Sequence, residues 1–138
     1  MRKVAGSNKW NCSVGSNVLK EGVHECKVIL LHKCNFLMAG VHNADEFTTE
    51  GNVSEGGNGC YLYTYYGTFY GNGETGSAGV GDCNQNGTEI NIKLHTSTGD
   101  VFFRVNNGEV VNKKHPKGPW RFSFDIFDLN AQFSVQFN

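Results

Sequence analysis

The most regular hydrophobic pattern in the chain lies between residues 87 and 108, where apolar and polar residues alternate with a period of two. Such alternation is typical of strands that bury one face and leave the other in water. Turn-forming residues interrupt the alternation at 96–100 and again at 106–108. The segment therefore predicts a meander of at least three antiparallel strands with one face directed to a core. Its apolar positions are Ile90, Ile92, Leu94, Val101, Phe103 and Val105.

Shorter runs of the same kind predict the other strands. Residues 28–31 are apolar at every position, which is typical of a central strand, and residues 36–41 are expected to return beside them as a hairpin. Residues 67–73 are expected to form the end of another hairpin. Two long loops are predicted, an acidic one at 42–59 and one rich in Gly and Asn at 71–87. The strands expected outside the meander are 12–14, 23–31, 36–41, 60–66, 122–126 and 133–137.

The composition agrees with an all-β fold. With 18 glycines against 2 prolines, and with Thr, Tyr, Phe and Asn common, the chain favours strands and tight turns over helices. Strands at this spacing with turn signals between them predict a two-sheet antiparallel β-sandwich. One domain is expected over residues 10–138, after a loose leader at 1–9. The predicted core contains Val28, Leu30, Ile90, Ile92, Leu94, Phe103, Phe122, Phe124, Phe133 and Val135.

Charge and cysteine content narrow the classes of partner. A net charge of −1 does not favour nucleic acid, and the basic segment at 112–119 is interpreted as a solvated loop. No apolar run is long enough to span a membrane, and no apolar signal-peptide region follows Arg2 and Lys3. The five cysteines lack C-x-x-C spacing and are expected to be reduced. We therefore expect an intracellular protein, cytoplasmic or nuclear, without a membrane partner.

The motifs do not support metal binding or catalysis. His24, Cys26, His32 and Cys34 repeat a His-x-Cys spacing, as zinc ligands can, but a hairpin that joined all four would need its turn at the strand-forming residues 28–30. Neither a G-x-S-x-G elbow nor a pair of facing carboxylates is evident. We expect no enzyme activity, no cofactor and no metal.

Five tyrosines, at positions 61, 63, 65, 66 and 70, leave two interpretations open. They can form a platform on which sugars or single-stranded nucleic acid stack. Alternatively, the side chains at 61, 63 and 65 cover one face of a sheet, as the period of two along that run indicates.

Four segments, taken in order, resemble the SPRY (B30.2-like) domain family. Residues 24–41 resemble its early strand pair, which closes on Gly-Val; 59–73 resemble its aromatic strand and small-residue turn; 98–108 resemble its turn glycine, Phe-containing strand and Asn-Gly; and 120–137 resemble its closing strand pair. The resemblance covers most of residues 20–137. The chain departs from the family pattern at 87–88, where Gly-Thr stands in place of Gly-Asp, and by an extra Asn before the Asn-Gly turn.

The resemblance implies a non-catalytic module, part of a larger protein, that binds another protein or a peptide through loops at one end of the sandwich. A lectin-like, carbohydrate-binding sandwich is the alternative. Phe127 is expected to be exposed because it falls out of phase with the inward positions 122, 124 and 126, although it can also tuck under a neighbouring loop. An apolar anchor ringed by polar groups is typical of a binding hot spot. The candidate peptide-binding residues are Asp45, Glu46, Glu50, Tyr61, Phe127, Asp128 and Asn130.

Overall fold

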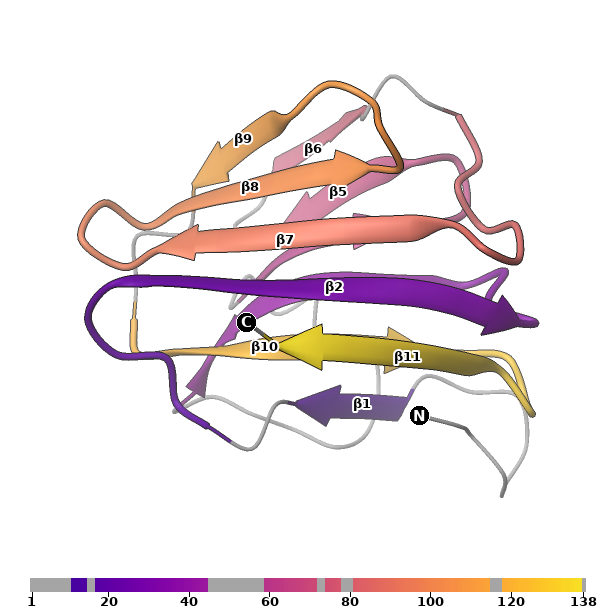
Figure 1. Ribbon diagram of the computed structural model, residues 1–138, viewed down its shortest axis with the longest axis horizontal. Helices are drawn as coiled ribbons and strands as arrows, with labels where there is room; N and C mark the ends of the chain where they lie inside the picture. The colour runs from indigo at the N-terminus through magenta and orange to yellow at the C-terminus, as the bar shows by residue number, and fades with distance from the viewer. Residues whose placement is uncertain are drawn as a thin grey trace.

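The chain folds into two antiparallel β-sheets that lie face to face (Figure 1). The computed structural model describes residues 11–14, 17–44, 59–71, 74–77, 81–114 and 118–137, so the predicted leader at 1–9 lies outside the described residues. In this part of the chain no helix is long and apolar enough to cross a membrane. The predicted all-β class and the two-sheet antiparallel β-sandwich are confirmed.

The described residues contain eleven strands. They are β1 (Asn11–Val14), β2 (Val23–His32), β3 (Leu37–Asn43), β4 (Gly59–Tyr63), β5 (Thr68–Gly71), β6 (Glu74–Ser77), β7 (Glu89–His95), β8 (Asp100–Val105), β9 (Val111–Lys114), β10 (Trp120–Ile126) and β11 (Gln132–Phe137). One sheet has six strands in the order β1-β10-β3-β4-β5-β6, and the other has five in the order β11-β2-β7-β8-β9. Figure 1 shows the five-stranded sheet in front of the six-stranded one.

The meander predicted from the alternation is confirmed as β7, β8 and β9, which are consecutive neighbours in the five-stranded sheet. Its register places Ile92 opposite Phe103, so both apolar positions face the core. Asn106 directly follows β8 and lies in the left-handed region, with a φ of 52° that Asn tolerates better than most residues. Its side chain Oδ1 accepts the backbone N–H of Glu89 at 3.0 Å, and its own N–H donates to the Glu89 carbonyl at 2.7 Å. These two bonds fix the pairing of the two strands.

The predicted hairpin between residues 28–31 and 36–41 is wrong. β2 pairs with β11 and β7, whereas β3 pairs with β10 and β4 in the opposite sheet. The turn after β2 crosses from one sheet to the other, with Lys33 at a φ of 51°. Residues 28–31 are also not buried on both faces, because Leu31 is 48% exposed. β2 is nevertheless an interior strand, as the apolar run predicted.

Two segments expected to be a hairpin end and a long loop contain further strands. β5 and β6 extend the six-stranded sheet, and the predicted strand 60–66 ends at Tyr63. Phe69 of β5 turns inward and packs against Phe103 of the opposite sheet, with ring centroids 5.1 Å apart. β6 carries no large apolar residue. A strand of this kind has no hydrophobic alternation, so the sequence pattern missed it.

The predicted core is confirmed except at one position. All ten predicted residues but Val135 are buried, and Val135 packs against the core while partly exposed on β11, which lies at the edge of its sheet. Aromatic pairs join the two sheets: the Phe124 ring of β10 lies 5.6 Å from the Phe133 ring of β11.

The outer face of the six-stranded sheet is also buried near its centre. Tyr61 and Ser123 have no exposed surface, and the Tyr61 hydroxyl donates to Ser123 Oγ at 3.2 Å. Between them β3 passes as Gly40, where a Cβ atom would lie 1.8 Å from the Cys60 carbonyl oxygen. Only glycine fits there, because the backbones of β3 and β4 approach too closely for any side chain.

We expect Phe124→Ala to lower the free energy of unfolding by about 3 to 5 kcal/mol, since the side chain is fully buried and its loss leaves a cavity between the sheets. Urea denaturation followed by tryptophan fluorescence measures the change. Val23→Ala, at a position 54% exposed, is the control and should change stability by less than about 1 kcal/mol. Equal losses in the two variants would contradict the assigned core.

Candidate functional site

Several connections meet at one end of the sandwich, because the antiparallel order brings the ends of alternate strands together. Figure 1 shows the turns after β2 and before β11 at the same end of the five-stranded sheet. In the six-stranded sheet the register places Ile126 beside Leu37 and Met38 beside Tyr63, so the turns after β10, before β3 and after β4 lie at that end too. We call the rings gathered there the aromatic patch. Its members are Phe36, Tyr63, Tyr65, Tyr66, Tyr70 and Phe127.

Phe36 is the centre of the aromatic patch. Its ring lies 5.7 Å from Phe127 in an edge-on arrangement, 5.0 Å from Tyr65 and 6.4 Å from Tyr63. Tyr63 continues the contact to Tyr70, at 5.8 Å. These separations are within the range in which aromatic pairs attract one another, so the rings support each other's positions. All of them remain partly accessible to solvent.

Two hydrogen bonds, one backbone–backbone and one to the Asp128 carboxylate, hold Phe36 and Phe127 together. The carboxylate Oδ2 of Asp128 accepts the N–H of Phe36 at 2.9 Å, and the N–H of Phe127 donates to the Phe36 carbonyl at 3.2 Å. The turn continues to Asn130, which has a φ of 65°, and Ala131 donates its N–H to the Asp128 carbonyl at 3.3 Å. The two aromatic residues therefore lie in turns whose backbone is fixed by hydrogen bonds.

Burial and nearby negative charge raise tyrosine pKa values in the aromatic patch. Burial, followed by the neighbouring Tyr70 and the Asp128 carboxylate, raises the pKa of Tyr63 to about 12. The hydroxyl of Tyr63 therefore stays protonated at neutral pH and remains able to donate a hydrogen bond. The patch offers apolar ring surface, hydroxyl donors and carboxylates.

Of the predicted site residues, Phe127, Asp128 and Asn130 are placed together and half-buried in the aromatic patch. Phe127 is out of phase with the core as predicted, and its ring is partly exposed. Its ring also packs against Phe36, so the predicted exposure and the predicted packing under a neighbouring loop each apply in part. Tyr61 is different, because it has no exposed surface and its hydroxyl is bonded to Ser123. The structure thus places Tyr61 inside the protein, where a partner cannot touch it without rearrangement.

Asp45, Glu46 and Glu50 lie outside the described residues, and their part in binding stays a prediction. The described ends of their loop are Ala44 and Gly59. Both ends lie away from Phe127, because β3 and β10 are antiparallel, with Asn43 opposite Trp120 at the far end of the pair. The sequence-based interpretation placed this loop and the 127–130 turn in one binding surface. Local sequence patterns do not report at which end of a sheet a loop begins.

Two residues of this surface were not predicted, Phe36 and Asp82. Phe36 carried a signal: it is out of phase with the inward Leu37 and Ala39, as Phe127 is with Ile126. Asp82 carried none, because it stands in a Gly- and Asn-rich segment without periodicity. Its Oδ1 accepts the N–H of Tyr66 at 2.6 Å across sixteen positions of sequence, a contact that only the fold creates.

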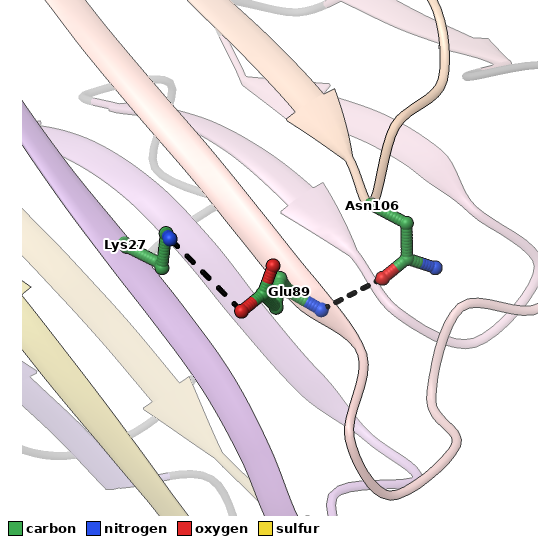
Figure 2. A network of polar contacts seen from close by, with 3 residues as sticks. All are labelled: Lys27, Glu89 and Asn106. Atoms are coloured by element: carbon green, nitrogen blue, oxygen red, sulfur yellow. Dashed lines mark hydrogen bonds and ion pairs between the residues drawn. The ribbon is translucent and has the colours of Figure 1, made fainter.

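A second surface, on the outer face of the five-stranded sheet, has a depression of about 520 Å³ over β2, β7 and β8. Four of its charged side chains form two ion pairs: Lys93 Nζ lies 3.0 Å from Glu25 Oε1, and Lys27 Nζ lies 4.0 Å from Glu89 Oε1. Figure 2 shows the second pair beside the bond between the Glu89 backbone and Asn106. Opposite charges placed across neighbouring strands are typical of a solvated sheet face. Arg104 also lines the depression, where its Nε donates to the Gly108 carbonyl at 3.1 Å.

The cysteines whose side chains are described are free and buried: Cys26, Cys34, Cys60 and Cys83. Burial raises the pKa of Cys26 to about 12, and burial followed by the Asp82 charge raises the pKa of Cys83 to about 11. Thiols of this kind are weak nucleophiles and poor metal ligands. In the described part of the chain, no group of three or more His, Cys, Asp or Glu side chains is placed to hold a metal ion.

No protein-family model matches the sequence, and no curated protein matches it either. Solved structures do match. The SPRY domain of human HERC1 aligns with a TM-score of 0.73 at 15% identity, over 96% of this chain and 84% of that one. A human SPRY domain aligns at 0.76 and 15% identity over 96% and 87%, and the TRIM65 PSpry domain at 0.69 and 11% over 91% and 70%. The chain has the SPRY β-sandwich fold, which the sequence resemblance predicted.

We expect Tyr63 to make stability depend on pH in the alkaline range. In the folded protein its pKa is about 12, whereas an unfolded tyrosine titrates near 10. The folded state therefore holds the proton longer, so the stability that Tyr63 contributes is present below about pH 10 and is lost as the pH rises to about 12. The urea midpoint of the wild type should fall more steeply over this window than that of Tyr63→Phe. Parallel profiles would contradict the raised pKa.

We expect Cys26 to resist alkylation in the folded protein. A pKa raised to about 12 lowers the thiolate fraction at neutral pH by roughly a thousandfold relative to a free thiol, and burial blocks access as well. Iodoacetamide labelling followed by peptide mass spectrometry should detect Cys26 modification in urea and little in buffer. Labelling of Cys26 in buffer at the rate of glutathione would show that the thiol is not enclosed.

Proposed function

We propose that this chain is a non-catalytic module that binds another protein or a peptide segment through the aromatic patch. The observation that carries the proposal is the pairing of Phe36 and Phe127, two half-exposed aromatic rings at the end of the sandwich that are fixed by a backbone hydrogen bond and a bond to the Asp128 carboxylate. Aromatic side chains that are held in place bind with little loss of conformational entropy, and they are enriched at the hot spots of protein interfaces.

The likeness in fold to SPRY domains supports this reading, since the family that the sequence resembles consists of protein-binding modules. The surfaces described above support the same proposal: two ion pairs cross the outer face of the five-stranded sheet, the centre of the outer face of the six-stranded sheet is buried, and six partly accessible rings gather at one end of the sandwich. Carbohydrate binding is less favoured, because the structural neighbours are SPRY domains rather than lectins.

We also propose that the protein acts inside the cell. The buried, free thiols of Cys26, Cys34, Cys60 and Cys83 support this location, because a reducing compartment keeps thiols in that form. Asp45, Glu46 and Glu50 belong to a loop whose described ends lie away from Phe127, so their predicted contribution would form a separate acidic part of the contact and favour a partner with basic residues.

The test is Phe127→Ala, assayed by affinity capture of partners from cells of the source followed by mass spectrometry. The matched control is Phe137→Ala, which removes an equally large ring, 57% exposed, from the other end of β11. We expect Phe127→Ala to weaken binding of a captured partner by about thirtyfold, the effect of truncating a hot-spot aromatic. Phe137→Ala should leave the affinity unchanged.

Thermal melts of both variants separate lost contact from lost folding. Loss of binding by Phe127→Ala with a melting temperature close to that of Phe137→Ala supports the patch. Full affinity in Phe127→Ala would show that the Phe36–Phe127 pair is not the anchor of the binding surface.

A further inference from the structure

Tyr66 is the most exposed ring of the aromatic patch and has an unusual backbone. It is 60% exposed and has a φ of 69°, followed by Gly67 at 59°. A bulky residue rarely adopts the left-handed region, where Gly, Asn or Asp is usual, so its presence there needs a reason. Burial of the ring is not the reason, since most of its surface faces water. The local structure holds the conformation through the Asp82 carboxylate, which accepts the Tyr66 N–H.

The packing of the rings decides what kind of group can bind there. Tyr66 lies against Tyr65 with centroids 4.0 Å apart, and Tyr65 in turn contacts Phe36 and Tyr63. Rings this close to one another leave no space between them for an ammonium group. A ligand must therefore lie on the outward side of Tyr66, where a flat group makes the largest contact.

The charges near the rings are negative. Among the described residues, the charged side chains that raise the tyrosine pKa values are carboxylates: Asp128 acts on Tyr63, and Asp82 acts on Tyr66 after the larger effects of its neighbour Tyr65 and of burial. Asp82 is exposed. Its hydrogen bond with the Tyr66 N–H uses Oδ1, and a carboxylate has acceptor capacity for more than one donor.

We propose that Tyr66 and Asp82 form a subsite for an arginine side chain of the partner. The guanidinium stacks on the outward face of the Tyr66 ring, and its N–H groups donate to the Asp82 carboxylate. A planar cation with several donors matches a flat ring beside a carboxylate, and arginine stacks on aromatic faces better than lysine does. The inference rests on the proposed function and specifies the chemistry of one contact within it.

The first test uses a small probe and needs no identified partner. ¹⁵N-labelled protein is titrated with N-acetyl-arginine amide, and separately with N-acetyl-lysine amide at matched ionic strength. We expect the arginine probe to shift the amide signals of Tyr66, Gly67 and Asp82, with an affinity roughly fivefold higher than that of the lysine probe. Absence of shifts at these residues, or equal affinity for the two probes, would overturn the proposal.

Two variants keep the fold while they alter the subsite. Tyr66→Gly relieves the left-handed backbone and removes the ring, so the melting temperature should stay the same or rise while the arginine shifts disappear. Asp82→Asn keeps an oxygen that can accept the Tyr66 N–H but removes the negative charge. It should therefore weaken binding of the arginine probe and also lower the smaller shifts caused by the lysine probe. Arginine binding retained in both variants would overturn the assignment.

The captured partner distinguishes this inference from the proposed function. If Phe127→Ala abolishes capture while Tyr66→Gly and Asp82→Asn retain full affinity, the aromatic patch is the binding surface and the arginine subsite is wrong. If Phe127→Ala retains the partner and Tyr66→Gly loses it, the proposed anchor is wrong and the subsite stands. If all three lose it with unchanged melting temperatures, both stand.

Discussion

One buried threonine joins the turns from which the aromatic patch is built. Thr64 has no exposed surface, and its hydroxyl accepts the N–H of Leu37 at 3.1 Å and donates to the Cys34 carbonyl at 3.1 Å. Its backbone N–H donates to the Leu37 carbonyl and its carbonyl accepts the N–H of Cys83, each at 2.9 Å. Through these four bonds, the crossing between the sheets, the turn after β4 and the segment before β7 form a single unit. A buried polar group placed this way must keep all of its partners, because each unpaired one would be left without water.

The hydrogen bonds of Thr64 also fix the positions of residues in and beside the aromatic patch. Phe36 stands one residue before the Leu37 that Thr64 binds, Tyr65 and Tyr66 directly follow Thr64, and Asp82 precedes Cys83. Hydrogen bonds to Thr64 thereby fix residues from three parts of the sequence relative to one another, independently of the contacts between their rings. Phe127 joins from a fourth part through Asp128. A surface assembled in this way is already ordered when a partner arrives, so binding does not have to order it first.

Elsewhere in the described part of the chain, ion pairs cross one outer sheet face and the centre of the other is buried. The outer face of the five-stranded sheet pairs its lysines with glutamates across neighbouring strands, and the centre of the outer face of the six-stranded sheet is buried around Tyr61 and Ser123. The inner faces form the core, where Phe124 meets Phe133 and Phe69 meets Phe103. Accessible aromatic surface therefore gathers where the strands end, as is usual for recognition surfaces carried on a stiff scaffold.

The sequence by itself determined the class of the fold, the meander of β7 to β9, the closing strands and nearly all of the core, because alternation with a period of two reports directly which side chains face inward. It also marked Phe127, which breaks that alternation. It did not determine which sheet β3 joins, since a turn that crosses between sheets and a turn that closes a hairpin use the same residue types. It also missed β6, whose pairing depends on backbone hydrogen bonds, and it placed Tyr61 among the exposed candidates although the sheet buries it. The tertiary structure alone decided that Asp82 supports Tyr66 and that Asp128 supports Phe36, because contacts between residues distant in the chain depend on how the sheets are assembled and leave no local pattern in the sequence.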